Sequence, residues 1–350
     1  MRIHVDKIGS VTRNLKLSRS LTLSDQFYIE PGSVIACRIH GEKSTYNQLE
    51  DPHGRLVTLH QGDLVVGALG HRNALHGYEG VMPTQLRVGD TLHMLNMGGV
   101  MGLCQSYNPD VGAPFRLEVL GQVMQFPEFQ SRIGQPAHIS MGALPLRDPS
   151  VRCPVVYIAG TCMNAGKTAA CCAVIRNFSQ RGLRIGGVKL TGVSLQRDIL
   201  SMRDYGASEI LDFTDAGIVC TSKDTAAATA KTLLTAMSEM DVDLIVAETG
   251  DGILGEYGVQ SILSDPDLNR LSSAFILCAN DPVGALGGID TLQKQFGIKV
   301  DIVAGPVTDN RVGERFVESL QIPARNARSN PKALGDLVFN ICYPTAQVAS

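Results

Sequence analysis

Residues 155–168 read VVYIAGTCMNAGKT, and this stretch decides the fold of the second half of the chain. The apolar segment Val155 to Ala159 predicts a buried strand, and an alanine-rich helical pattern follows the stretch. Glycines between a strand and a helix let backbone N–H groups curl around phosphate, and the start of the helix adds positive potential. Lys167 is placed to bridge the terminal phosphates, and the Thr168 hydroxyl is placed to bind Mg²⁺. We therefore expect ATP or GTP, with Mg²⁺, at this loop.

This arrangement of strand, glycine-bounded loop, GKT and helix is the P-loop pattern, and it supplies most of the predicted cofactor contacts. These are Gly160, Thr161, Asn164, Ala165, Gly166, Lys167, Thr168 and Ala169. Lys167 is also a catalytic candidate, because phosphoryl transfer depends on positive charge held at the phosphates. The loop is longer than usual, since five residues rather than four separate Gly160 from Gly166.

The longer loop, GT-x-x-x-x-GKT, resembles that of the dethiobiotin synthetase family and its cobyrinate amide synthetase relatives. The resemblance covers residues 155–325 and leaves out the first 145. In dethiobiotin synthetase the second strand ends in a lysine that approaches the phosphates and the substrate carboxyl or carbamate. The matching stretch here is GVKLTG at residues 187–192, so the resemblance gives Lys189 a catalytic role. Without it, a lysine at a strand end is more often a solvated surface charge.

The same resemblance implies where Mg²⁺ is held. Asp198 stands where the family uses an aspartate, with Asp204 as its competitor, and Arg197 beside it is a candidate phosphate contact. Glu248 closes the strand of residues 243–252, which resembles the family's strand ending in VEGAGG. It is predicted to hold Mg²⁺ directly or through water, because hard cations prefer oxygen ligands near phosphate. The predicted metal ligands are Thr168, Asp198 and Glu248, and Glu248 is also a catalytic candidate, with Asp251 in reserve.

Two further stretches extend the resemblance. Residues 305–310 resemble the strand and polar turn that contact the base, which makes Asn310 a cofactor contact. The sequence RDYGA at residues 203–207 also resembles the GTP-binding adaptor of molybdopterin guanine dinucleotide synthesis. Because both families share one ancestral fold, the sequence predicts the fold better than the reaction.

From residue 148 to 350, apolar runs of strand length alternate with amphipathic runs of helix length, which predicts a doubly wound, mostly parallel α/β P-loop NTPase domain. Expected strands are 155–159, 185–190, 244–247, 274–279 and 300–304, and expected helices are 166–181, 199–208, 224–240, 284–295 and 311–320. In the first helix, Asn177 falls on the face opposite the apolar one. The polar, proline-containing segment 146–154 is the expected linker.

Residues 1–147 have a different pattern, in which short β-rich runs are broken by turn signals. A turn that feeds a strand recurs at 31–35, 61–65 and 88–92, and small barrels are commonly assembled in this way. We therefore expect an all-β, barrel-like domain. All eight histidines precede residue 150, so we expect phosphoryl chemistry without an imidazole base in the P-loop domain.

Composition narrows the partners. The formal net charge of -3 with scattered Lys and Arg excludes the basic patch of a nucleic-acid binder, and no apolar run is long enough to span a bilayer. Nine cysteines without a CxxC pair indicate reduced thiols and a cytoplasmic protein. We expect a small-molecule substrate, no nucleic acid, no membrane and a homodimer.

The sequence assigns no function to two glycine-rich loops of the first half. Polar residues between glycines at 67–80 indicate either a substrate or metal contact or an exposed barrel turn. The run NMGGVMG at 96–102 is glycine-rich, but no helix follows it, so it is not a dinucleotide loop.

Two functions fit the sequence. One is an ATP-dependent, ligase-like enzyme that phosphorylates a carboxylate or carbamate of a small metabolite, as the first resemblance implies, with the β domain choosing the substrate. The other is a nucleotide-hydrolysing adaptor or switch that serves a partner enzyme or cofactor pathway.

Overall fold

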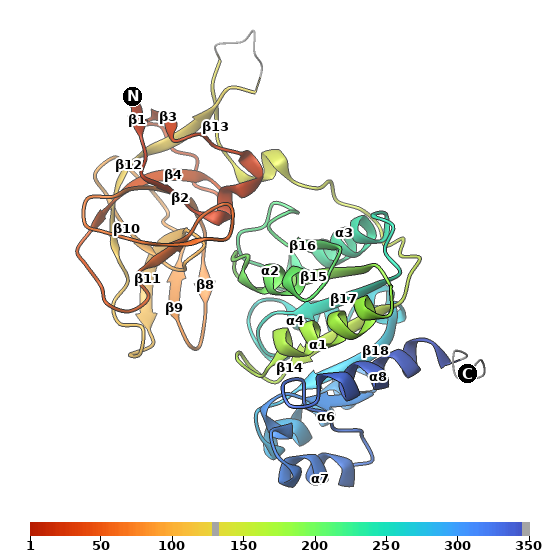
Figure 1. Cartoon of the computed structure of the whole chain (residues 1–350). Coiled ribbons are helices and arrows are strands. Elements are labelled where there is room, and N and C mark those ends of the chain that lie inside the picture. The colour runs from red at the N-terminus through yellow and green to blue at the C-terminus, as the bar shows by residue number, and fades with distance from the viewer. Residues whose placement is uncertain (128–132, 345–350) are drawn as a thin grey trace. The chain divides into compact units, whose positions relative to one another are not determined.

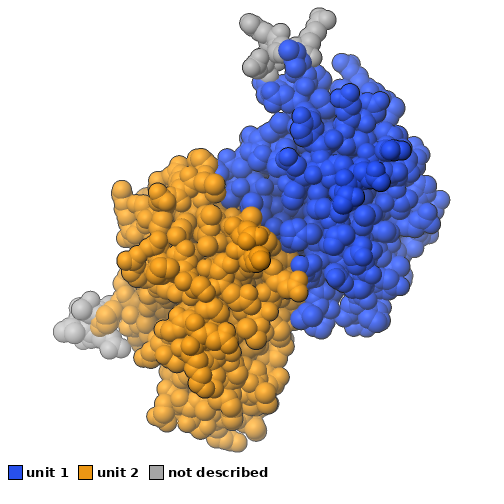
Figure 2. All heavy atoms as spheres, turned by 180° about the vertical axis from the view of Figure 1, so that it is seen from behind, with its two compact units in different colours: residues 1–144, 193–196, 214–220 blue, residues 145–192, 197–213, 221–350 orange. Residues whose placement is uncertain are grey.

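The computed structural model describes residues 1–127 and 133–344, and these form two compact units (Figures 1 and 2). The β-rich unit consists of Met1–Leu144 together with Val193–Gln196 and Thr214–Cys220. The nucleotide unit contains the other described residues, from Pro145 onward. Two short segments from the second half of the sequence are thus built into the β-rich unit.

The nucleotide unit is a parallel α/β domain, as predicted. Its sheet has the strand order β16-β15-β17-β14-β18-β19, and every neighbouring pair is parallel. Because neighbouring strands are parallel, the chain must cross over between them through helices, and β14 and β15 are even separated by β17. The strands are β14 (Val155–Gly160), β15 (Ile185–Thr191), β16 (Glu209–Asp212), β17 (Leu244–Thr249), β18 (Ser272–Cys278) and β19 (Ile302–Ala304).

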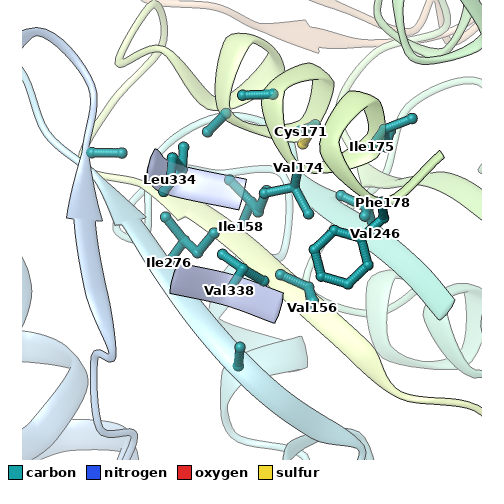
Figure 3. Packing of buried hydrophobic residues seen from close by; sticks show 14 of the residues in the cluster. Val156, Ile158, Cys171, Val174, Ile175, Phe178, Val246, Ile276, Leu334 and Val338 are labelled. Atoms are coloured by element: carbon teal, nitrogen blue, oxygen red, sulfur yellow. The ribbon is translucent and has the colours of Figure 1, made fainter. Parts of the chain in front are cut away.

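Helices connect and cover these strands. They are α1 (Lys167–Gln180), α2 (Arg197–Asp204), α3 (Ala226–Ser238), α4 (Val259–Leu263), α5 (Pro266–Arg270), α6 (Pro282–Phe296), α7 (Arg311–Ser319) and α8 (Pro331–Cys342). Figure 3 shows the core on one side of the sheet, where Val174 and Phe178 of α1 meet Val338 of α8 above strand residues such as Val156 and Ile276. Burial of such side chains contributes about 1.5–3 kcal/mol each. This core fixes α1, and with it the loop that precedes α1.

Helix α8 was not predicted, and its presence corrects the expectation for Asn177. That side chain is 8% exposed rather than solvated. Its Nδ2 donates to Asp336 Oδ1 at 2.9 Å, and Arg181 donates to the same carboxylate at 2.6 Å. Asn177 therefore lies at the contact between α1 and α8, which the helical period of α1 alone could not show. The elements β16, α4 and α5, each four or five residues long, were also missed.

The β-rich unit contains a closed barrel, in agreement with the barrel-like prediction. Strand β12 pairs with β4, β4 with β7, β7 with β11, β11 with β10, and β10 with β12, so the pairing returns to its start. These strands are β4 (Val34–His40), β7 (Leu64–Leu69), β10 (Thr91–Met94), β11 (Val100–Tyr107) and β12 (Arg116–Gln125). The recurring turns precede β4, β7 and β10, and their glycines, Gly32, Gly62 and Gly89, all have the positive φ that such turns require.

Shorter elements surround the barrel. They are β1 (Arg2–His4), β2 (Lys7–Ile8), β3 (Ser20–Ser24), β5 (Gln48–Glu50), β6 (Leu56–Thr58), β8 (Arg72–Asn73), β9 (Tyr78–Val81), β13 (Gln135–Pro136) and the 3₁₀ turns η1 (Ser10–Leu15) and η2 (Ile139–Gly142). A third 3₁₀ turn, η3 (Pro306–Thr308), belongs to the nucleotide unit. The barrel interior is filled by apolar side chains such as Ile35, Leu92 and Leu117. It is a packed core rather than an open channel.

Candidate nucleotide-binding site

The loop between β14 and α1 has the geometry that phosphate binding requires. Gly166 (φ 88°) and Asn164 (φ 59°) both have left-handed backbone conformations, which curl the loop before α1 begins at Lys167. The Nζ atom of Lys167 lies back along the loop and donates to the carbonyl oxygen of Cys162 at 2.8 Å. A nucleotide phosphate would replace that carbonyl as the partner of the ammonium group.

Gly160 serves the loop in a way that the sequence pattern did not indicate. A Cβ atom at this position would lie 2.9 Å from Cδ of Lys167 and 3.0 Å from its Nζ. The missing side chain therefore makes room for the lysine stem. Any larger residue would push Lys167 out of its position over the loop.

The sheet order places the other predicted residues beside this loop. Strand β17 lies between β14 and β15, with Glu248 in register with Ile158 on one side and Lys189 on the other. All three strands are parallel, so their carboxyl ends meet at one edge, where doubly wound folds bind ligands. Lys189 and Glu248 thereby come next to a loop that is distant from both in sequence.

A cavity of about 330 Å³ opens at this edge. It is lined by Met163, Asn164, Ala165, Gly166, Lys167, Thr168, Ala169, Lys189, Arg197, Asp198, Glu248, Gly250 and Asp251. The structure thus brings together every predicted catalytic and metal-binding residue, and six of the nine predicted cofactor contacts. Two lysines, one arginine and three carboxylates face one small space, which suits a phosphate chain with a divalent cation.

Lys189 and Asp198 form a buried ion pair within this cavity, with side chains 10% and 15% exposed. Burial alone would lower the pKa of Lys189, but the neighbouring Asp198 and Glu248 carboxylates outweigh it and raise the pKa. Burial acts against ionisation of Asp198 too, yet Lys189 and Arg197 hold the pKa of Asp198 below its ordinary value. Both groups are therefore charged at neutral pH. Lys189 is not the solvated surface lysine that its place at a strand end would otherwise suggest.

Glu248 is a buried carboxylate within this cluster. Its Oε1 accepts a hydrogen bond from the Thr168 hydroxyl at 3.3 Å, and its Oε2 accepts one from the Cys171 thiol at 3.7 Å. Burial, and next the Asp198 carboxylate, raise the pKa of Glu248. A divalent cation beside Thr168 would reduce the cost of ionising Glu248, because a positive charge favours the ionised carboxylate.

The donor set fits Mg²⁺ bound together with a nucleotide. In the described residues, no group of three or more His, Cys, Asp or Glu side chains is arranged to hold a metal by itself. Mg²⁺ in P-loop proteins does not need such a group, because phosphate oxygens and water supply most of its ligands. Thr168 and Glu248 would hold the ion here, and Asp198 lies on the same cavity wall.

The two alternative metal ligands, Asp251 and Asp204, differ in their position relative to the cavity. Asp251 lines the cavity with a left-handed backbone (φ 72°), and burial raises the pKa of its carboxyl group. Non-glycine residues with such backbones are concentrated at functional sites. Asp204, at the end of α2, is not among the lining residues. Of Asp198 and its competitor Asp204, the structure therefore places Asp198 at the cavity.

Three predicted cofactor contacts lie outside the cavity lining. Gly160 lies beneath Lys167, as described. Thr161 donates its backbone N–H to Cys278 O at 2.9 Å, and its side chain lies beside Gly284 and Gly288 of α6. Asn310 caps α7, since its Oδ1 accepts from the N–H groups of Val312 and Gly313. A direct nucleotide contact by these residues stays a prediction.

The polar loop of residues 67–80 has a structural explanation for its arginine. Arg72 is 5% exposed, donates to the Tyr46 hydroxyl at 2.7 Å and also to the Leu95 carbonyl oxygen. Its guanidinium lies 5.6 Å from the ring of Tyr46 and 5.8 Å from that of Tyr78. Burial lowers the pKa of the neighbouring His71. Arg72 therefore has a structural role, but it is buried and not exposed as the barrel-turn interpretation expected.

Comparison with known proteins gives remote structural likeness. No family model matches the chain, and no curated protein matches it. Similar solved structures include chloroplast FtsY from Physcomitrella patens (17% identity, 56% of this chain and 68% of that chain, TM-score 0.37). Others are FtsY from Elizabethkingia anophelis (15%, 55% and 67%, 0.36) and the signal recognition particle 54 kDa protein from Aeropyrum pernix in complex with GDP (14%, 56% and 47%, 0.38).

The geometry of the chain itself establishes the class of its second half. A parallel sheet, a glycine-bounded loop, the lysine at the start of α1 and the carboxylate on the neighbouring strand form a P-loop NTPase domain. Within the described residues, no helix is both long and apolar enough to cross a membrane. The likeness to dethiobiotin synthetase, in contrast, remains a matter of sequence.

Proposed function

We propose that the chain binds a nucleoside triphosphate with Mg²⁺ and hydrolyses it as a switch or adaptor. The observation that carries this proposal is the cavity in which Lys167, Lys189 and Glu248 face one another. Lys167 would neutralise the terminal phosphates, and Thr168 with Glu248 would hold Mg²⁺. The remaining chemistry, attack by water on the terminal phosphate, depends mainly on this positioning and charge.

Two features favour hydrolysis and switching over ligation. Lys189 is paired with Asp198, so its charge is already compensated and not free for a substrate carboxylate. The cavity volume, about 330 Å³, lies at the small end of ligand pockets, and its lining consists mainly of groups that suit phosphate and metal. A triphosphate with Mg²⁺ would fill such a space.

The ATP-dependent ligase is the second candidate, and one observation favours it. Lys189 lines the cavity and does not face solvent. The resemblance to dethiobiotin synthetase implies a lysine at this position that serves both the phosphates and the substrate. If nucleotide binding separates Lys189 from Asp198, the ammonium becomes available to a carboxylate or carbamate.

Steady-state hydrolysis distinguishes the two functions. Phosphate release is measured with ATP and with GTP, each with and without Mg²⁺, for the wild type and Lys167→Ala. A switch should show slow, Mg²⁺-dependent turnover that small carboxylic acids, amines and bicarbonate leave unchanged. Stimulation of ATP turnover by one such metabolite, with formation of an acyl phosphate or amide, would favour the ligase. Absence of hydrolysis under all conditions would reject both.

A further inference from the structure

The loop between β15 and α2 is divided between the two units. Thr191 and Gly192 belong to the nucleotide unit, Val193–Gln196 to the β-rich unit, and Arg197 and Asp198 to the nucleotide unit again. This loop, residues 191–198, leads directly from the strand of Lys189 to the cavity residue Asp198. Val193–Gln196 is therefore the direct chain connection between the strand of Lys189 and Asp198.

Buried polar residues of the β-rich unit hold this segment by hydrogen bonds. Asn96 Nδ2 donates to the backbone oxygen of Ser194 at 2.7 Å. The backbone N–H of Gln196 donates to Glu50 Oε1 at 2.8 Å. Asn96 and Glu50 are each 1% exposed. Hydrogen bonds of this kind contribute about 0.5–1.5 kcal/mol each, and leaving one unmade costs more because a buried group stays unsatisfied.

The side chain of Gln196 adds a third anchor, since its Nε2 reaches the backbone oxygens of Asp51 and Pro52 at 3.4 and 3.3 Å. Thr214–Cys220, the other segment from the second half of the sequence that belongs to the β-rich unit, also bonds to Val193–Gln196. Ser194 donates its N–H to Val219 O at 2.8 Å, and Thr214 Oγ1 donates to Ser194 Oγ at 2.9 Å. Ser194 and Gln196 are thus each held by more than one hydrogen bond.

The glycine-rich run of residues 96–102 explains why the fit is close. A Cβ atom on Gly98 would lie 2.1 Å from the backbone oxygen of Ser194. A Cβ atom on Gly67 would lie 2.0 Å from the oxygen of Gly99. Backbones approach here at distances that only glycine permits. The run therefore allows close backbone packing against Ser194, and this explains its glycines without a nucleotide-binding role.

We propose that Asn96 and Glu50 are positioning residues for Asp198 and so for the Mg²⁺ site. Asp198 lies two residues after Gln196, in the first turn of α2. A shift of Gln196 is passed through this short connection to Asp198 and to its ion pair with Lys189. The β-rich unit thereby sets the metal affinity of a site to which it contributes no ligand. This inference rests on the proposed Mg²⁺-nucleotide function.

The test compares two amide-to-carboxylate changes in the full-length protein. Asn96→Asp keeps an acceptor for the Val100 N–H, at 3.1 Å, but replaces the donor to Ser194 by a repelling oxygen. Gln122→Glu is the matched control, because Gln122 is 0% exposed and donates to Val34 O and Ala137 O away from the loop. Gln196→Ala is a milder second variant that introduces no buried charge.

The readout is the gain in nucleotide affinity caused by Mg²⁺, measured as the ratio of dissociation constants of fluorescent ATP and GTP in EDTA and in Mg²⁺. Asn96→Asp and Gln196→Ala should lower this ratio by about fivefold or more, with dissociation constants in EDTA within about twofold of wild type. Gln122→Glu should lower the thermal unfolding midpoint and leave the ratio unchanged.

Two results would overturn the inference: a wild-type ratio in both loop variants, or an equal loss in Gln122→Glu. A wild-type protein whose affinity does not depend on Mg²⁺ would overturn it as well. Failure of the proposed function is distinguishable from these outcomes. A chain that hydrolyses neither nucleotide can still show a Mg²⁺-dependent affinity, and the variants then decide the positioning role alone.

Discussion

Two loops contribute to the phosphate cavity, and they are held in different ways. The loop of residues 160–166 is shaped largely from within, by the left-handed Asn164 and Gly166 and by the bond from Lys167 to Cys162. In the loop of residues 191–198, Ser194 and Gln196 are held by Asn96 and Glu50, which lie 98 and 146 positions earlier in the chain. The first is a local structure that its own sequence encodes. The second is held by residues that are far away in sequence.

The largest effect is expected from the first loop. Lys167→Ala should weaken binding of Mg²⁺-nucleotide by about a hundredfold or more, because each tenfold corresponds to about 1.4 kcal/mol and the ammonium group is the main positive charge at the terminal phosphates. Isothermal titration with ATP and GTP measures the loss. The nucleotide-free unfolding midpoint serves as control and should stay near the wild-type value. Tight binding by a folded variant would contradict the site.

A smaller effect is expected where the two loops meet the metal. Glu248→Gln should lower the Mg²⁺-dependent gain in affinity by about tenfold. It should also stabilise the nucleotide-free fold at neutral pH. Burial and Asp198 raise the pKa of Glu248, so its ionised form costs free energy, and the wild type loses stability as the pH rises above the ordinary glutamate value.

Thermal unfolding of this variant and of wild type across the pH range checks the sign. The advantage of Glu248→Gln should be present at neutral pH and vanish in acid, where the carboxyl group is protonated in both the folded and the unfolded chain. The exposed Glu256, changed to Gln, is the control for the loss of one negative charge. An advantage that persists in acid would show that ionisation is not the cause.

Gly98→Ala perturbs the contact that holds the second loop at Ser194. The added methyl group would overlap the Ser194 oxygen, so the variant should lose about 1–3 kcal/mol of stability from overpacking. It should also lose part of the Mg²⁺-dependent affinity, by about fivefold. Gly287→Ala is the matched change, because nothing lies within 4 Å of its Cβ position and the residue is inside α6. That control should be neutral or stabilising.

The smallest effect is expected far from both loops. Asp336, on α8, accepts hydrogen bonds from Lys332, Asn177 and Arg181, which lower its pKa to about 2. A lowered pKa means that the stabilisation is complete above the ordinary aspartate value and disappears as the pH falls toward 2. Asp336→Asn should therefore cost a few tenths to about 1 kcal/mol at neutral pH, as exposed ion pairs do.

Chemical denaturation at neutral pH and near pH 2 measures this difference. Nucleotide and Mg²⁺ affinities should match wild type, since α8 supports the core beneath α1 and none of its residues lines the cavity. A change in Mg²⁺ affinity would contradict this expectation, because it would show that a helix outside both loops also affects the metal site.

The α/β order of the second half and the barrel-like first half could be predicted from sequence, because apolar periodicity and turn residues act over a few positions. Long elements such as α1 and β17 were therefore found, and short ones such as α4 and α5 were missed. Asn177 was misplaced for a related reason. The periodicity of one helix shows which side chains are polar, but not whether a second helix will cover them.

The sequence by itself determined the phosphate-binding loop. Its glycines, its lysine and the strand and helix around it are adjacent in the chain, so backbone geometry alone can assemble them. Only the tertiary structure decided the rest of the site. Placing Lys189 beside Glu248 requires the order of strands β15, β17 and β14, and pairing Lys189 with Asp198 requires α2 to pack against β15. The loop 191–198 connects these two elements. That loop is fixed by contacts between residues far apart in sequence, whose partners no local pattern reveals.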